Sequence, residues 1–346
     1  MQALEFEREA VYRLPAILAE LFDEPEPGRA LIFEPVDRGV DVVVDAGGRR
    51  WAVQAKTSSS PGTVATVAEW LAALNLGDAV PVLVVPYMTP AGAKAAAERH
   101  LNWIDLSGNA WLRERDLYVS VQGRPNQFEA RGRPASPFAP KSSRVARTLL
   151  LDTARWWRQK DLSEHTDLDP GRVSRVVRRL EDEQLLERHD SCLRPRDPDL
   201  LLDAWADDYR FDRHDIITGH LSGSGVELAR ELDANLDIAG IDHAFTGLPA
   251  AWALDPFARF RLVSVYVTGD PRVAADAVGL RRNERGANVQ IIGPDDRGVF
   301  DGQRTIEDLP CVAPMQVYLD LGHLPERAAE AAEHLRAEGG LWHASA

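Results

Sequence analysis

The stretch LSEHTDLDPGRVSRVVRRLEDEQLLER, residues 162–188, decides the fold of the central part of the chain. Asp169 is a common helix-capping residue and Pro170 suits the first helical position, so a helix is predicted to begin at Pro170. Apolar side chains fall on one face of this helix and arginines largely on the other: Val173, Val176, Val177 and Leu180 against Arg172, Arg175, Arg178 and Arg179. The apolar face is suited to packing, which leaves the arginines free.

The flanking residues complete a recognisable order of elements. Residues 143–151 predict an apolar helix, residues 160–165 a short second helix, and residues 166–169 a turn. After the third helix, LLERHDSCLRP (185–195) reads as two short extended runs around a turn at His189-Asp190. Residues 141–196 are therefore predicted to form a winged helix-turn-helix.

Such a module would present its basic helix to the major groove of double-stranded DNA, where guanidinium groups bind guanine edges or phosphates. Residues 131–196 contain 15 Lys and Arg against 10 Asp and Glu, whereas the whole chain has a net charge of −14. A helical bundle with a solvated basic face is the alternative. The predicted DNA-binding residues are Arg172, Ser174, Arg175, Arg178 and Arg179 in the helix, with Arg188 and Arg194, and also Arg196, in the wing.

The stretch 162–188 resembles winged helix-turn-helix regulators of the MarR-like type. The resemblance implies double-stranded DNA as the partner. A homodimer is expected because winged-helix proteins commonly pair on two half-sites.

Residues 1–123 alternate helix-like and strand-like segments, which indicates an α/β domain with a mixed sheet. The segment opens with a helical pattern. Strands are predicted at LIFEPV (31–36), VDVVVDA (40–46), WAVQAK (51–56), VPVLVVPY (80–87), LNWIDL (101–106) and LYVSV (117–121), with a turn at Gly47-Gly48 and helices at 64–74 and 91–100.

Three polar residues on two of these strands could form a catalytic site. Gln54 and Lys56 share one face of their strand, and Asp41 can face them if the strands pair through the glycine turn. A carboxylate beside an amide oxygen can hold Mg²⁺, and a neighbouring lysine can stabilise charge on a phosphate.

This pattern resembles the PD-(D/E)xK nuclease superfamily, in particular the QxK variant of Mrr-like restriction enzymes. The resemblance implies a restriction-endonuclease-like domain with Asp41, Gln54 and Lys56 as catalytic positions, Asp41 and Gln54 as Mg²⁺ ligands, and Glu9 or Glu20 as a helper. Asp45 is a rival ligand. Three interpretations stay open: an inactive scaffold with no cofactor, an active Mg²⁺-dependent nuclease, and an accidental motif.

Residues 124–140, rich in Pro, Ser, Gly and Arg, are predicted to be a linker. Residues 197–346 predict a further α/β domain, with strands at 261–269, 288–294 and MQVYLDL (315–321) and a final helix at 324–338. Tyr318, Asp320 and His323 are polar groups near a predicted strand end, and a structural role is favoured over a catalytic one. Asp105, Ser107, Gly108 and Asn109 are predicted to form a tight turn.

Four motifs, WIDLSGNAWL (103–112), FTGLPAAWAL (245–254), NVQIIGPDD (288–296) and VAPMQVYLDL (312–321), resemble bacterial AbiEi-type antitoxins of type IV toxin–antitoxin systems. The resemblance implies a regulator that joins a winged helix to a C-terminal domain and represses its own operon. Here the predicted winged helix is internal rather than N-terminal.

Composition narrows the class of protein. The 346 residues are 45% hydrophobic and 27% charged, as in an ordinary globular protein, and the two cysteines lie far apart, which favours a reducing cytoplasm over a zinc site. No apolar run approaches a membrane span. The sequence predicts a DNA-binding transcriptional regulator with an inactive nuclease-like domain. The alternatives are a Mg²⁺-dependent endonuclease targeted by its winged helix, or an antitoxin.

Overall fold

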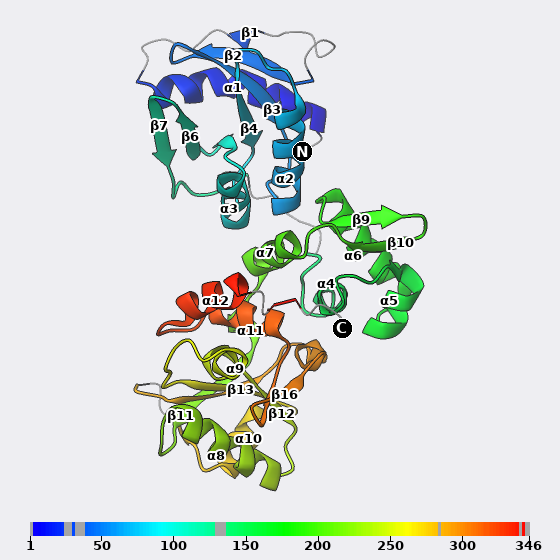
Figure 1. Cartoon of the computed structure of the whole chain (residues 1–346), viewed down its shortest axis with the longest axis vertical. Coiled ribbons are helices and arrows are strands. Elements are labelled where there is room, and N and C mark those ends of the chain that lie inside the picture. The colour runs from blue at the N-terminus through cyan, green and yellow to red at the C-terminus, as the bar shows by residue number, and fades with distance from the viewer. Residues whose placement is uncertain are drawn as a thin grey trace. The chain divides into compact units, whose positions relative to one another are not determined.

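The computed structural model describes residues 3–23, 30–31, 39–128, 136–282, 285–338 and 341–342. The chain, shown in Figure 1, divides into two compact units. The N-terminal unit comprises residues 1–135, 178–187 and 196–207, and the C-terminal unit comprises residues 136–177, 188–195 and 208–346. The predicted winged helix-turn-helix therefore contributes residues to both units. Among the described residues, no helix is long and apolar enough to cross a membrane.

The N-terminal unit contains a seven-stranded mixed sheet whose strands follow one another in sequence order. Strands β3, β4 and β5 are parallel and the other neighbours are antiparallel. The strands are β1 (Ala30–Leu31), β2 (Val42–Ala46), β3 (Arg49–Ala55), β4 (Val80–Val85), β5 (Asn102–Asp105), β6 (Ala110–Glu114) and β7 (Leu117–Val121), and the helices are α1 (Ala3–Leu21), α2 (Pro61–Ala73) and α3 (Pro90–Glu98).

The predicted hairpin between β2 and β3 is confirmed. Gly47 and Gly48 have φ values of 59° and 66°, the left-handed conformation that a tight hairpin turn needs. The indole of Trp51, on β3, is fully buried and donates to the carbonyl of Ala46 at 3.1 Å. Of the strand predicted at 31–36, only Leu31 lies within the described residues.

Helix α1 covers one face of this sheet (Figure 1). Its buried side chains recur at helical spacing and pack on β2, β3 and β4, which is the pattern of an amphipathic helix on a sheet. Helices α2 and α3 pack against each other, and α2 also contacts β4. The core under α1 includes Phe6, Ala10, Leu14 and Leu18 from the helix and Val42, Val44, Trp51, Val53, Val82 and Val84 from the sheet.

The central segment contains the three predicted helices and the predicted hairpin. The helices are α4 (Ser143–Leu151), α5 (Gln159–Thr166) and α6 (Pro170–Asp182), followed by β9 (Leu186–His189), β10 (Cys192–Pro195) and α7 (Pro198–Asp208). A short strand that the sequence did not reveal, β8 (Trp157–Arg158), pairs with β10 and completes a three-stranded sheet.

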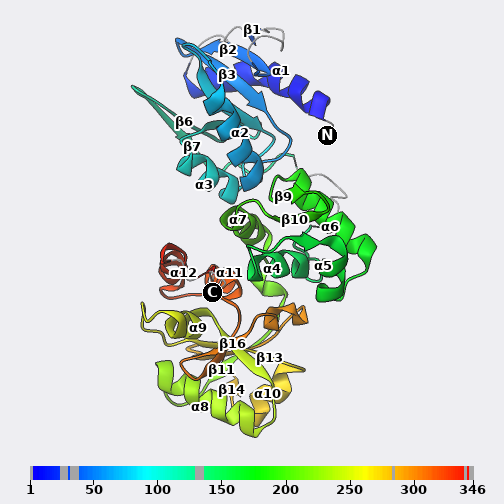
Figure 2. The same cartoon turned by 45° about the vertical axis from the view of Figure 1, so that its right-hand side comes forward.

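The C-terminal unit is built on a second seven-stranded mixed sheet, ordered β14-β11-β15-β13-β12-β17-β16. Helices α9, α11 and α12 pack on one another, and α8 packs on α10 (Figure 2). The strands are β11 (Asp215–His220), β12 (His243–Thr246), β13 (Val263–Val267), β14 (Arg281–Arg282), β15 (Val289–Gly293), β16 (Arg304–Ile306) and β17 (Leu309–Cys311). The helices are α8 (Gly225–Ile238), α9 (Gly247–Leu254), α10 (Pro271–Ala277), α11 (Pro314–Leu321) and α12 (Ala328–Ala337), with 3₁₀ turns η1 (Phe211–Arg213) and η2 (Arg297–Phe300).

The prediction of a strand at MQVYLDL (315–321) is wrong, because these residues form helix α11. Pro314 occupies the first turn, and nearly every following side chain is buried. A short run that is buried all round lacks the periodicity that separates a helix from a strand. The strands predicted at 261–269 and 288–294 are confirmed as β13 and β15, and the final helix is confirmed as α12.

Candidate nucleic-acid interface

Helix α6 begins where the sequence predicts. The carboxylate of Asp169 accepts a hydrogen bond from the backbone N–H of Arg172 at 2.9 Å, which is an N-cap, and Pro170 is the first helical residue. The predicted apolar face is buried, namely Val173, Val176, Val177 and Leu180.

The opposite face of α6 contains two arginines that are available for a ligand. Arg175 and Arg178 are exposed, and neither has a hydrogen bond or ion pair among the described residues. Arg172 lies 3.8 Å from the carboxylate of Asp169, and Arg179 donates to Glu183 at 2.9 Å. Of the four arginines of α6 that are predicted to bind DNA, two therefore have no partner in the part of the chain that the structure describes. Ser174, predicted beside them, is exposed.

The turn that sets the direction of α6 is held by local hydrogen bonds. Asp167 adopts the left-handed conformation with φ of 55° and ends α5. The backbone N–H of Leu168 returns to the carbonyl of Ser163 at 3.3 Å, and the hydroxyl of Ser163 donates to the carbonyl of Leu168. These bonds close a compact turn between α5 and α6.

Aromatic and cationic side chains that were not among the predicted residues lie in and just before β8, where Trp156 contacts the β9–β10 hairpin. The guanidinium of Arg194 lies 4.5 Å from the ring centre of Trp156, and His189 contacts the same ring edge-on. Arg155 lies 3.8 Å over the ring of Trp157. The signal was the pair Trp156-Trp157 flanked by Arg155 and Arg158, because interleaved aromatic and basic residues are typical of nucleic-acid surfaces. Arg188, predicted in the wing, is exposed.

Helix α4 is joined to the C-terminal sheet by a buried ion pair. The guanidinium of Arg144 binds both carboxylate oxygens of Asp296 at 2.7 Å, and the two side chains are only 10% and 8% exposed. Arg144 also donates to the carbonyl of Thr166, the last residue of α5, at 3.2 Å. Hydrogen bonding to Asp296 raises the pKa of Arg144. One side chain therefore bonds to both α5 and the turn η2.

A second arginine of α4 enters a buried polar network. Arg147 donates to the side-chain oxygen of Gln316 at 2.5 Å, and Gln316 donates to Asp320 at 2.8 Å. Asp320 is fully buried and also accepts hydrogen bonds from Tyr209, Tyr266 and Thr246. Burial raises the pKa of Asp320 and lowers that of Arg147. A structural role for Asp320 is supported because its oxygens are occupied by internal donors.

His214 lies at the far end of this network. Its Nδ1 accepts a hydrogen bond from the backbone N–H of Asp295 at 3.1 Å, so its Nε2 carries the proton beside the hydroxyls of Tyr209 and Tyr266. Burial lowers the pKa of His214, which keeps the ring neutral.

Of the three nuclease-like residues, Gln54 lies near the end of β3, Lys56 directly follows that strand, and Asp41 directly precedes β2 beside Gln54. Oδ2 of Asp41 accepts hydrogen bonds from the amide nitrogen of Gln54 and from the backbone N–H of Ala55, both at 2.7 Å. Lys56 is half-buried, and its ammonium has no polar partner among the described residues. Gln54 therefore acts here as a donor to the carboxylate.

The acids proposed as helpers or rival ligands have other partners. Glu9 pairs with Arg13 at 3.4 Å, Glu20 accepts from Arg124 at 2.9 Å, and Asp45 lies 3.8 Å from Arg50. In the described part of the chain, no three His, Cys, Asp or Glu side chains gather in a way that could hold a metal ion. The residues that are present offer one carboxylate and one amide to a cation.

The predicted turn at 105–109 is confirmed. The carboxylate of Asp105 accepts from the backbone N–H of Asn109 at 2.8 Å, from its side-chain amide at 2.9 Å, and from the backbone N–H of Met88 at 3.1 Å. These bonds give Asp105 a structural role.

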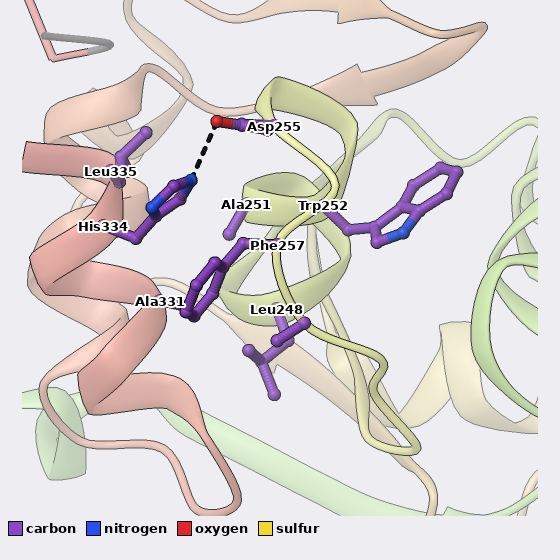
Figure 3. Close-up of a pocket in the computed structure, with 9 residues that line it drawn as sticks. Leu248, Ala251, Trp252, Asp255, Phe257, Ala331, His334 and Leu335 are labelled. Atoms are coloured by element: carbon purple, nitrogen blue, oxygen red, sulfur yellow. Dashed lines mark hydrogen bonds and ion pairs between the residues drawn. The ribbon is translucent and has the colours of Figure 1, made fainter. Parts of the chain in front are cut away.

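A small apolar hollow lies between α9 and α12 (Figure 3). His334 points to Asp255 across it, with 2.9 Å between Nε2 and the carboxylate, and its ring stacks on that of Phe257 at 4.2 Å. Apart from the His334–Asp255 pair, the hollow offers little chemistry.

Part of the residues described above lies in a segment that matches a known protein family. Residues 194–339 match the model of a family described as "Transcriptional regulator, AbiEi antitoxin, Type IV TA system". The match begins in β10 and includes Asp296, Gln316 and Asp320. No curated protein and no solved structure matches the chain.

Proposed function

We propose that this chain is a sequence-specific double-stranded DNA-binding transcriptional regulator, with residues 141–196 as a winged helix-turn-helix. The observation that carries the proposal is α6, whose valine face is buried while Arg175 and Arg178 are exposed and have no partner among the described residues. A capped helix with a buried apolar face and free guanidinium groups suits the major groove. The family match at residues 194–339 supports the regulatory role.

The wing would add contacts with the DNA backbone. Arg188 is exposed, and Arg194 is held against Trp156, so their charges belong to one hairpin. Contacts of this kind fix the register of a protein on the duplex without specifying sequence. We expect a homodimer that places one α6 in each DNA half-site, because winged-helix modules commonly bind DNA as dimers. We place this protein in the cytoplasm, where its DNA target lies.

A gel shift with DNA from the region upstream of its own gene tests the proposal. Arg175→Ala and Arg178→Ala should each weaken binding by about 1–3 kcal/mol if the side chain contacts a base. Arg281→Ala, in the exposed strand β14, removes an equal charge elsewhere and serves as the control. Unchanged affinity in both α6 variants would refute the assignment of α6.

The N-terminal unit is proposed to have a restriction-endonuclease-like fold that acts as a scaffold. Its order of one helix, three antiparallel strands, a helix and a parallel strand agrees with the PD-(D/E)xK resemblance. The inactive form is favoured because Gln54 donates its amide to Asp41, which leaves the carboxylate satisfied without a cation. A Mg²⁺-dependent nuclease would instead cleave plasmid DNA in a way that Lys56→Ala abolishes.

An antitoxin role is the second candidate, and the family match favours it. If a toxin gene lies next to the gene for this chain, expressing the two together should relieve the growth inhibition that the toxin causes. The double variant Arg175→Ala/Arg178→Ala separates the two roles. Rescue by this variant would place antitoxin activity outside DNA binding, whereas loss of rescue would tie it to repression.

A further inference from the structure

We propose that Arg144 and Asp296 are positioning residues for DNA binding, which hold the helix-turn-helix on the C-terminal sheet in its binding geometry. The inference rests on the proposed function and adds to it. It assigns the C-terminal sheet a direct part in presenting the DNA-binding helix, through residues that cannot themselves touch DNA.

The position of Arg144 supports this role. Its guanidinium donates two hydrogen bonds of 2.7 Å to the carboxylate of Asp296 and a third hydrogen bond to the backbone carbonyl of Thr166. Thr166 ends α5, three residues before the cap of α6 at Asp169. A paired guanidinium–carboxylate fork fixes orientation as well as distance. The start of α6 is therefore tied to Asp296 through a single side chain.

Asp296 is equally well placed on the other side of the contact. It follows β15, an inner strand of the C-terminal sheet, and its carboxylate also accepts from the backbone N–H of Gly298 to start η2. A Cβ at Gly298 would lie 3.1 Å from Cγ of Arg144, so glycine there leaves room for the arginine stem. The sheet, the turn η2 and the helix-turn-helix thus meet at one buried pair.

Burial separates positioning from direct contact. Both side chains are about nine-tenths buried, so a polynucleotide cannot reach them. Nearby, Arg297 pairs with Asp167 at 3.1 Å, but these side chains are 72% and 78% exposed. Exposed pairs of this kind contribute little, so Arg297 supplies a matched control within the same turn.

The expected loss of DNA affinity depends on the fraction of molecules in which the helix-turn-helix keeps its binding geometry. If Asp296→Asn loosens the helix-turn-helix, only a fraction of molecules has the binding geometry, and the apparent Kd rises by the inverse of that fraction. The bound complex itself is unchanged, so it neutralises the same number of phosphates. The slope of log K against log salt should therefore stay that of the unaltered protein.

The test measures binding of the upstream DNA by the full chain between about 50 and 200 mM salt. We expect Asp296→Asn and Arg144→Lys to weaken binding about tenfold or more, with parallel salt dependence, and Arg297→Ala to have little effect. A folded Asp296→Asn variant with unaltered affinity would overturn the inference, and so would a lowered slope. If the unaltered protein itself does not bind DNA, the proposed function fails instead.

Should both variants fail to fold, hydrogen exchange on the unaltered chain decides. DNA that binds α6 should slow exchange at residues 166–169 and also at residues 296–300, because the pair couples them. Protection confined to α6 and the wing would overturn the proposal.

Discussion

The hydroxyl of Ser60, which precedes α2, donates to the backbone carbonyl of Glu183 at the end of α6, with 2.9 Å between the two oxygens. Ser60 also caps α2 by accepting from the backbone N–H of Thr63. The C-terminal end of α6 thus meets the N-terminal end of α2 inside the N-terminal unit, which brings opposite ends of two helix dipoles together. Arg196 strengthens the contact through Glu69 and Thr66.

Gly62 makes this contact possible, so Gly62→Ala should destabilise the N-terminal unit. A Cβ at residue 62 would lie 2.5 Å from the carbonyl oxygens of both Glu183 and Gln184, which belong to backbone and cannot rotate away. Overpacking of this kind costs about 1–3 kcal/mol. Thermal unfolding followed by circular dichroism measures the loss.

Gly171→Ala, in the first turn of α6, is the control for this substitution. Its Cβ would have only the carboxylate of Asp169 nearby, at 3.3 Å. Added helix propensity should keep its unfolding temperature the same or raise it. Equal behaviour of the two variants would show that the α2–α6 contact is loose in solution.

Local signals in the sequence were enough to predict α6 and its neighbours. The cap at Asp169, the first-turn proline and the alternation of valine and arginine faces all act within a few residues, and the structure confirms each. The Gly47-Gly48 turn was predictable for the same reason.

Contacts across long sequence separations were not predictable. Arg144 and Asp296 are 152 positions apart, and nothing near Arg144 distinguishes it from a solvated basic residue. The requirement for glycine at residue 62 depends on carbonyls more than a hundred positions away. Helix α11 was wrongly predicted as a strand. It is buried on all sides, so its sequence lacks the helical alternation of apolar and polar residues.

Asp41→Ala should destabilise the sheet without affecting DNA binding. The substitution leaves the amide of Gln54 and the backbone N–H of Ala55 without their acceptor, and Gln54 is 7% exposed. Leaving buried donors unsatisfied costs about 1–3 kcal/mol, measured here by urea unfolding. Lys56→Ala, which breaks no such bond, is the control. If instead Mg²⁺ raises the unfolding temperature of the unaltered protein and not of Asp41→Ala, the site binds metal.

His214 should make the C-terminal unit lose stability as the pH falls from about 7 to 5, whereas Asp320 and Asp295, whose pKa values burial raises, act in the opposite direction. Burial lowers the pKa of His214 in the folded protein. As the pH falls, the imidazole therefore becomes protonated in the unfolded chain before it does in the folded chain. The contribution of His214 to stability is therefore complete above its unfolded pKa of about 6.5 and decreases below it, by at most about 1.4 kcal/mol per pH unit.

Urea unfolding at a series of pH values measures this slope. His214→Gln removes the titrating ring and should flatten the dependence, although its stability at neutral pH also falls because the hydrogen bonds to Tyr209 and Tyr266 are disturbed. His323→Gln is the comparison, since desolvation also lowers the pKa of His323, which is more exposed. A larger flattening in His323→Gln than in His214→Gln would contradict the assignment.

Trp156→Ala should weaken DNA binding through the wing, although Trp156 carries no charge. Its ring lies 4.5 Å from the guanidinium of Arg194 and also contacts His189, so its loss removes one packing contact from each of these side chains. A cation–π contact at an exposed site contributes about 0.5–1 kcal/mol, and the arginine must then be ordered at the expense of binding. Fluorescence anisotropy with labelled duplex DNA measures the change.

Trp156→Phe keeps an aromatic face for Arg194 and should recover most of the affinity. Arg194→Ala in the Trp156→Ala background should add little further loss, because the two side chains act as one unit. Fully additive losses would mean that Trp156 and Arg194 contact DNA independently, and the stacked arrangement would then have no part in binding.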